Sequence, residues 1–214
     1  APNLRPETVT SYELGLRFER ANGYFAVNAF QAKYDDFIQS FYNPPGTTEY
    51  TYRNISKVDI WGIEASGAWE LSDRTGIDFS AAWQEGRQKV TPTSASTPHT
   101  LPPLTATVAL SHEIPAWDLS LEGVLTLASD VKETDSPTDF KPGGYALLDL
   151  YANWEVIENG FIKFGVQNVF DKRYFTANAA NYGVTASTAV ASVNPIELQT
   201  GPGRTFVISF DKTF

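Results

Sequence analysis

The last stretch of the sequence, residues 201–214, constrains the fold more than any other feature. Two glycines and a proline precede a run in which apolar and mainly polar residues alternate. On an extended chain, one face of this run carries Phe206, Ile208, Phe210 and Phe214. Alternation at period two indicates a strand with one apolar and one mainly polar face. A soluble sandwich would bury the aromatic face, whereas a membrane barrel would turn it toward lipid and its small polar residues toward the lumen.

The same alternation recurs along the whole chain. The Asn22-Gly23 dipeptide is a strong hairpin signal, and the apolar face continues in register on both sides of it. We expect strands at Thr10–Glu19, from Asn22-Gly23 to about Ile38, and at Tyr52–Leu71, Ile77–Gln84, Thr105–His112, Asp118–Leu127, Tyr145–Glu155, Phe161–Gln167 and the final run. The sequence therefore predicts an all-β fold of about nine strands.

The connections between these strands alternate in length. Short turns are expected at Asn22, Asp73, Pro115 and Asn159. Long stretches separate them at Ser40–Thr51, Glu85–Pro103, Ala128–Gly144 and Phe175–Thr200. Outer-membrane barrels have short periplasmic turns and long extracellular loops, whereas a sandwich mixes turn lengths at both ends. Strands of about 10 residues tilted at about 45° also suffice to cross the hydrocarbon layer.

Tryptophans support the same interpretation. Trp69, Trp83, Trp117 and Trp154 lie near the ends of expected strands, where an interfacial aromatic belt would place them. Trp61 lies further inside its strand and does not contribute to this pattern.

The odd strand count leaves neither edge of the sheet with a closing partner. Bacterial barrels have even counts, and unpaired strand edges in lipid cost several kcal/mol per polar group. We therefore expect residues 1–214 to be the C-terminal part of a larger barrel, starting in an extracellular loop. An exported protein needs a signal peptide, and none is recognisable in this sequence, so we expect the chain to be either a mature form or a fragment.

Composition excludes several function classes. The 214 residues contain no Cys, which removes disulfides, thiol catalysis and Cys-ligated zinc. A formal charge of −9 argues against a nucleic-acid partner. The sequence has no run of 18 consecutive apolar residues, so we expect no transmembrane helix.

Three segments resemble one family. The segment Gly165–Tyr174, followed by a long loop and an aromatic-ended strand, is similar to the C-terminal end of TonB-dependent outer-membrane receptors. Tyr52-Arg-Asn54 with Gly62-Ile-Glu64, and Pro6-Glu7 with Tyr12-Glu-Leu-Gly15, resemble earlier elements of that barrel.

The resemblance implies the last nine strands of a 22-stranded barrel in the bacterial outer membrane. Implied partners are outer-membrane lipid and lipopolysaccharide, the protein's own N-terminal plug and remaining strands, and the TonB complex, which would contact the N-terminal part. The chain ends on a mainly aromatic row, which resembles the assembly signal of such barrels. The row consists of Phe206, Ile208, Phe210 and Phe214.

Within this family, Pro2-Asn3-Leu4 is similar to the Asn-Pro-Asp/Asn-Leu box of haem and haemoprotein receptors, although Ala1 stands in its first place. The similarity implies haem as a transported ligand rather than a covalently bound cofactor, and an extracellular haem protein as a partner. An axial histidine would then come from a loop upstream of the box. A receptor for a ferric siderophore or another nutrient is the alternative.

Four residues are candidate ligand contacts: Asn3, Phe41, Tyr42 and His99. Tyrosine and other aromatics are favourable contact residues, but they also anchor strands at interfaces. A loop histidine such as His99 is more often simply solvated, and neither it nor His112 has a second ligand at metal-binding spacing. We expect no metal site and no catalytic residue.

Inward carboxylates have a structural interpretation. Glu13, Glu64, Glu122 and Asp149 are expected to pair with lumen cations such as Arg17 and Lys163, or to contact a plug. Asn168 and Asp171 are expected to cap a strand end and hold the last hairpin. A barrel protease or lipase would need a nucleophile with a base at the rim, and two histidines offer little for that. A passive pore and a soluble sandwich are weaker alternatives.

Overall fold

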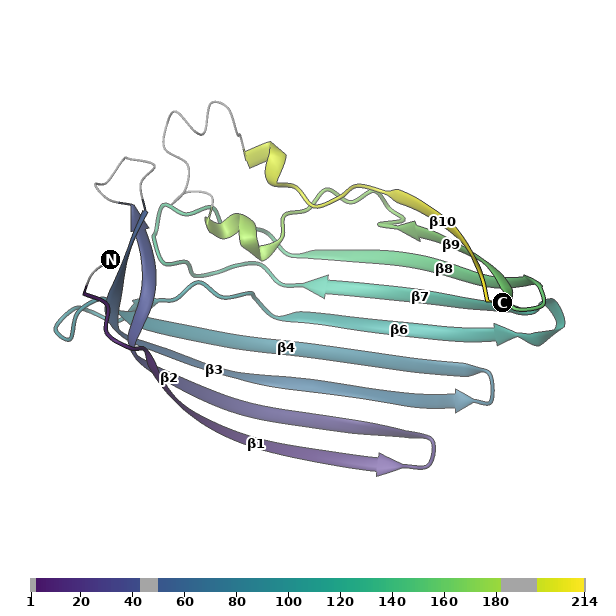
Figure 1. Cartoon of the computed structure of the whole chain (residues 1–214), viewed down its shortest axis with the longest axis horizontal. Coiled ribbons are helices and arrows are strands. Elements are labelled where there is room, and N and C mark those ends of the chain that lie inside the picture. Colours follow the sequence, from purple (N-terminus) through teal and green to yellow (C-terminus); the bar gives the residue numbers. More distant parts are fainter. Residues whose placement is uncertain (1–2, 43–49, 182–195, 214) are drawn as a thin grey trace.

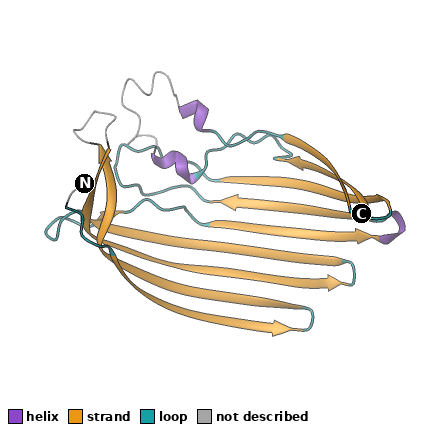
Figure 2. Ribbon diagram, in the orientation of Figure 1, coloured by secondary structure: helices purple, strands orange, loops and turns teal. Residues whose placement is uncertain are grey.

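In the part of the chain that the structure describes, ten strands form one antiparallel sheet, and its nine long strands follow one another in chain order (Figures 1 and 2). The computed structural model describes residues 3–42, 50–181 and 196–213. The strands are β1 (Thr8–Arg20), β2 (Gly23–Tyr42), β3 (Tyr50–Ser72), β4 (Thr75–Lys89), β5 (Thr97–Pro98), β6 (Thr105–Ile114), β7 (Leu119–Ala128), β8 (Tyr145–Ile157), β9 (Gly160–Gln167) and β10 (Thr205–Lys212). Short 3₁₀ helices are η1 (Pro115–Trp117), η2 (Ala177–Asn181) and η3 (Ile196–Gln199). In the described segments, no helix is both long and apolar enough to span a membrane.

The two ends of the sheet differ, as the sequence predicts. Four short turns join consecutive strands at one end, on the right in Figure 1, and the long connections gather at the other end. Asp118 and Asn159 adopt left-handed backbone conformations in two of these turns, at φ 48° and 56°. Asp and Asn are among the residues that tolerate this region best, which explains why the chain reverses there.

Several strands are longer than predicted. The hairpin of β2 and β3 extends to Tyr42 and Tyr50, through residues expected to form a loop. Similarly, β4 continues to Lys89, and the two-residue strand β5 returns to pair with it. The extension of β4, residues 85–89, is polar on both faces, so the alternation disappears there although the backbone hydrogen bonds continue. Periodicity detects a strand by its apolar face and therefore misses its polar extension.

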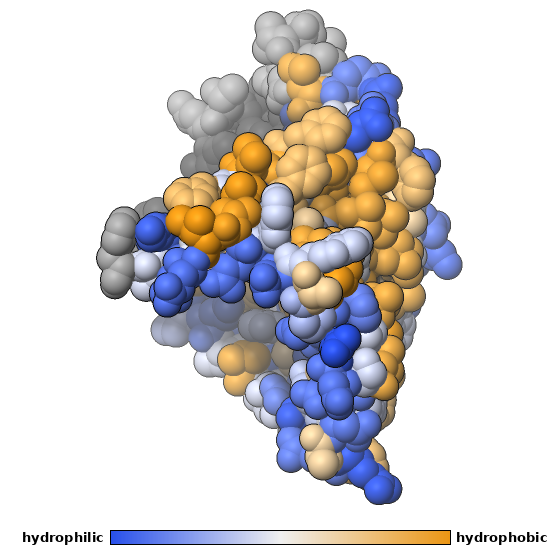
Figure 3. All heavy atoms as spheres, turned by 90° about the vertical axis from the view of Figure 1, so that its right-hand side faces the viewer, coloured by the Kyte–Doolittle hydropathy of each residue, from blue (hydrophilic) through white to orange (hydrophobic). Residues whose placement is uncertain are grey.

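The pairing register places the predicted apolar residues on one side. Across β7 to β10, Leu125 pairs with Leu148, and Leu150 pairs with Val166, which pairs with Phe206. Paired residues point to the same side of a sheet, so these side chains form continuous apolar rows. Viewed from the end with the short turns, hydrophobic residues gather along one side of the molecule (Figure 3). This is the expected lipid-facing surface.

The strands β1 and β10 lie at the two edges, and within the described sheet they do not pair with each other. Apolar side chains on both edges are largely exposed. They include Leu14 at 76% and Leu16 at 72% on β1, and Phe206 at 67% and Ile208 at 73% on β10. Phe210 shares the same face, and Phe214 lies outside the described residues.

Three of the four tryptophans expected at strand ends lie there: Trp69 near the end of β3, Trp154 near the end of β8, and Trp117 in the turn between β6 and β7. Trp83 is not near the end of its strand, because β4 continues to Lys89. It pairs with Ile63, and Trp61 lies two residues away on the same face of β3. Beyond Trp61 the outward residues become charged. Trp61, which the sequence left without a role, therefore marks one border of the apolar surface together with Trp83. Near the other border, Trp69 and Phe79 stack with ring centroids 6.2 Å apart.

Candidate functional site

The long connections pack against one another above the sheet. His99 follows β5 and is only 15% exposed. Its backbone N–H donates to the carbonyl of Gly86 at 3.0 Å, its Nδ1 lies 3.1 Å from Gln88 Oε1, and its ring meets Phe37 edge-on at 5.8 Å. Burial lowers the pKa of His99, against the opposing effect of Asp135 at 4.0 Å. The interpretation of His99 as a solvated loop histidine is therefore wrong.

Thr100 lies in the segment before β6, and Asp135 lies in the segment after β7. Hydrogen bonds between these two residues join the two segments. The backbone N–H and hydroxyl of Thr100 both donate to Asp135 Oδ1, and the Asp135 N–H donates back to the Thr100 hydroxyl at 2.8 Å. Arg87 and Glu133 add an ion pair at 3.2 Å. These contacts make one packed unit of two loops that the sequence shows only as separate stretches.

Asn3 lies in an exposed lead-in that is fixed to the bent hairpin of β2 and β3. Arg5 forms an ion pair with Asp36, which has a left-handed backbone at φ 56°. The side chain of Asn54 bonds the backbone of Arg5 and also donates to the carbonyl of Asp36. Sequence analysis singled out Tyr52-Arg-Asn54 only as a family motif. Its structural role, to hold the lead-in at the loop end of the barrel wall, was missed.

Phe41 and Tyr42 end β2, where their backbones pair with Thr51 and Tyr50. They lie at the loop end of the sheet, on the hairpin that also carries Phe37. Contact of these two residues with a ligand stays a prediction, as it does for Asn3 and His99. In the described part of the chain, no three His, Cys, Asp or Glu residues are grouped as a metal site would require.

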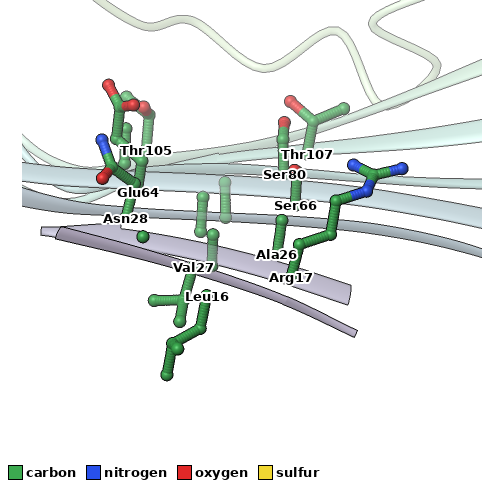
Figure 4. A pocket seen from close by; sticks show the side chains of 15 residues that line it. Leu16, Arg17, Ala26, Val27, Asn28, Glu64, Ser66, Ser80, Thr105 and Thr107 are labelled. Carbon is green, nitrogen blue, oxygen red and sulfur yellow. The ribbon is translucent and has the colours of Figure 1, made fainter. Parts of the chain in front are cut away.

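The polar face of the sheet forms a shallow concavity of about 560 Å³. Figure 4 shows Arg17, Glu64 and Ser66 pointing to one side of the strands, and Leu16 and Val27 pointing to the other. Small residues line the rest of this concavity, among them Gly15, Ala26, Ser80 and Thr107. The predicted inward and outward faces are therefore confirmed for these strands.

Arg17 and Lys163 do not pair with the inward carboxylates for which they were expected, and contact of those carboxylates with a plug stays a prediction. Arg17 pairs with Glu19 and lies 4.1 Å from the centroid of the Tyr24 ring, and Lys163 pairs with Asp211 at 2.9 Å. These pairs join residues on the same or adjacent strands, which side chains of this length reach without crossing the lumen. Among the described residues, Glu13, Glu64 and Glu122 form no ion pair.

The structural role expected for Asn168 is confirmed. Its side chain is nearly buried and bonds the backbone of Lys172 through both amide atoms, at 2.8 and 2.9 Å, and the carbonyl of Pro202 at 3.1 Å. Its own N–H donates to Asp149 Oδ1 at 2.7 Å. Asp171 accepts a bond from the Arg204 N–H at 2.9 Å. Together these residues join the two ends of the connection between β9 and β10.

Comparison with known proteins agrees with this architecture. Residues 1–169 match the family described as TonB dependent receptor-like, beta-barrel. The whole chain aligns at 24% identity with 25% of the probable hemoglobin and hemoglobin-haptoglobin-binding protein 4 of Haemophilus influenzae. Another similar relative is the ferrienterobactin receptor of Escherichia coli, at 26% identity over 99% of this chain and 30% of the receptor.

Among solved structures, the copper transporter OprC superposes on the whole chain with a TM-score of 0.79, at 23% identity and over 32% of its own length. The chain thus spans about a quarter to a third of the length of the proteins it matches.

Proposed function

This chain belongs to the TonB-dependent receptor β-barrel family, and from that premise we propose that residues 1–214 form the C-terminal part of the barrel wall of an active-transport receptor. Proteins of this family lie in the bacterial outer membrane, and so does this chain. In the proposal, the rest of the protein supplies the remaining strands of a 22-stranded barrel, the plug that closes it and the segment that contacts TonB. The receptor does no covalent chemistry.

The transported substrate we favour is an iron source, as haem or a haem-carrying protein. The observation that carries this choice is the alignment of the whole chain with relatives named for binding hemoglobin and hemoglobin-haptoglobin. The Pro2-Asn3-Leu4 segment supports it. The packed loop unit around His99 and Asp135 would then offer the ligand a preformed surface, which lowers the entropy cost of binding.

A ferric siderophore is the second candidate. The ferrienterobactin receptor aligns over nearly the whole chain with similar identity. Both substrates would enter through the same loops and the same lumen, so the barrel wall alone does not distinguish them.

Absorption spectroscopy of the full-length receptor tests the choice. We expect haemin to give a Soret band that persists in His99→Ala, because His99 contacts Gln88 and Phe37 and, among the residues that the structure describes, belongs to no cluster of metal ligands. A histidine upstream of residue 1 should remove the band when mutated. Tight binding of ferric enterobactin without a haem band would contradict the haem proposal and leave the receptor class intact. Loss of the band in His99→Ala alone would place the axial ligand in this chain.

A further inference from the structure

The hairpin of β2 and β3 turns away from the sheet at its loop end (Figure 1). Asp36, with its left-handed backbone at φ 56°, marks the corner. Beyond it the hairpin continues as an arm, described at residues 37–42 and 50–55. At the base of the arm, the ring of Phe37 meets the ring of His99 edge-on, with centroids 5.8 Å apart. The arm is therefore attached to the connection between β4 and β6.

The long connections then contact one another in chain order. Thr100, next to His99, shares three hydrogen bonds with Asp135 in the connection between β7 and β8. In that same connection, Phe140 packs edge-on against Phe175, with ring centroids 5.0 Å apart. Phe175 belongs to the connection between β9 and β10. A continuous series of contacts thus runs from the arm to the last long connection.

Three of these connections meet with almost no space between them. Pro103, Val131 and Phe175, one from each connection, line a gap of only about 20 Å³. Such a gap has room for about one water molecule. The segment after β5 also rests directly on β4, because a Cβ atom on Gly86 would lie 2.8 Å from Leu101. Movement of one connection therefore disturbs the packing of its neighbours.

The buried apolar side chains of the described residues lie in this region and not on the lipid-facing wall. They are Ile55, Val58, Val131, Ala179 and Ala180. The first belongs to the arm, the second lies beside its corner, and the other three belong to the connections. The loop end thus has a packed core of its own, as a small soluble domain would. Segments that share such a core tend to open together.

We propose that the arm and the long connections form one cooperative unit that opens and closes as a whole. The unit comprises residues 37–42, 50–55, 97–104, 129–144 and 173–181. A disturbance in the connection between β9 and β10 reaches the arm through the contacts of Phe140, Asp135 and His99. The barrel wall below does not take part in this opening, because its strands are held by their own backbone pairing.

In a receptor, such a unit makes ligand contact with one connection change the stability of all the others, including the arm. This consequence rests on the proposed function, whereas the cooperative opening itself does not. Opening is measured without any ligand. Failure of the cooperative unit and failure of the proposed function are therefore separate results.

The test is hydrogen exchange of the full-length receptor in detergent. Thr100→Val keeps the shape of the side chain and removes the two hydrogen bonds that its hydroxyl shares with Asp135. We expect exchange to be about 2- to 10-fold faster in residues 97–104, the factor that corresponds to one hydrogen bond, and equally faster in residues 37–40 of the arm. Thr138→Val is the matched control, because the Thr138 hydroxyl bonds Ser136 within its own connection. It should leave the arm unchanged.

A second variant disturbs the unit at its far end. Phe140→Leu weakens the contact with Phe175 and should accelerate exchange in residues 37–40 by the same factor as in residues 173–177. Phe170→Leu makes the same change at a side chain that is 76% exposed, and it should have no effect on the arm.

Exchange of β6 and β7 separates opening of the unit from unfolding of the barrel. In both Thr100→Val and Phe140→Leu it should equal that of the unaltered receptor. Acceleration confined to the connections that carry or contact the substituted residue, with the arm unchanged, would overturn the proposal. Equal acceleration in β6 and β7 would overturn it as well, because the opening would then belong to the whole barrel.

Discussion

The side-chain amide of Asn54 bonds both polar groups of the Arg5 backbone. Its Oδ1 accepts from the Arg5 N–H at 2.8 Å, and its Nδ2 donates to the Arg5 carbonyl at 3.0 Å. The Asn54 side chain thereby holds the lead-in against the β2–β3 hairpin and takes the place of a pairing strand for the Arg5 backbone.

We expect Asn54→Ala to release this lead-in. Loss of two or three hydrogen bonds, each worth about 0.5–1.5 kcal/mol, should leave the global fold intact and raise hydrogen exchange of residues 3–7. Asn28→Ala, on the inner wall of the same hairpin, is the control and should leave that exchange unchanged. Equal protection of residues 3–7 in both variants would contradict the role given to Asn54.

Asn168→Ala should destabilise the sheet at its C-terminal edge. It leaves the backbone groups of Lys172 and Pro202 without partners in a nearly buried position, at a cost of about 1–3 kcal/mol. Urea unfolding of the full-length barrel in detergent measures the change. Because only the backbone of Lys172 is used, Lys172→Ala should have little effect. Asn168 has a left-handed backbone at φ 48°, which glycine adopts without strain. Asn168→Gly therefore removes the hydrogen bonds without adding backbone strain, and comparison with Asn168→Ala separates the two effects.

Leu150→Arg places a charge on the lipid-facing surface. We expect a cost of about 2–4 kcal/mol at mid-depth, measured by barrel unfolding in lipid vesicles. Tyr151→Arg, on the opposite face, should cost much less, but the ring of Tyr151 covers Gly165 and its hydroxyl accepts a bond from Gln167 at 3.1 Å. Thr126→Arg is the cleaner control, because Thr126 lies on the inner face without such contacts. Equal costs at Leu150 and Thr126 would mean that the faces are assigned wrongly.

The packing of His99 should weaken on acidification. Burial lowers its pKa, so the unfolded chain binds the proton more tightly, and stability is lost as pH falls from about 6.5 toward the folded pKa. Proteolysis of residues 97–104 should therefore be faster at pH 5 than at pH 7.5. His99→Phe removes this difference, whereas His112→Gln keeps it. Burial raises the pKa of Asp139, which acts in the opposite direction and is present in every variant.

The outward row of β10 should direct assembly. Replacing Phe206, Ile208 and Phe210 with Ser is expected to reduce the folded, heat-modifiable barrel in outer-membrane fractions, and deletion of Phe214 should act in the same direction. Thr205→Ser/Val207→Ser changes the other face of the strand and should leave assembly unaffected. Undiminished assembly after the triple replacement would remove the assembly role.

The sequence was sufficient for features that depend on alternation. The positions of Leu150 and Tyr151 on opposite faces, the four short turns and the identity of the family all follow from patterns within a strand or turn. It was insufficient where the partner is distant. Nothing near Thr100 points to Asp135, and nothing near Asn54 points to Arg5, since each contact depends on how the hairpins fold above the sheet. The polar extension of β4 to Lys89 was missed because it has no apolar face to detect.

The connection from Gln167 to Thr205 is the longest in the sheet, and Asn168 and Asp171 bond residues near its far end, Pro202 and Arg204. Every other long strand pairs across a shorter connection with its neighbour in the chain. The entropy cost of closing a loop grows with the length of the loop, so the pairing of β10 with β9 costs the chain more conformational entropy than any other pairing of neighbouring strands. Once Asn168 is bonded to Pro202, only a few residues separate this contact from the paired ends of β9 and β10. The last hairpin can then form as if its loop were short.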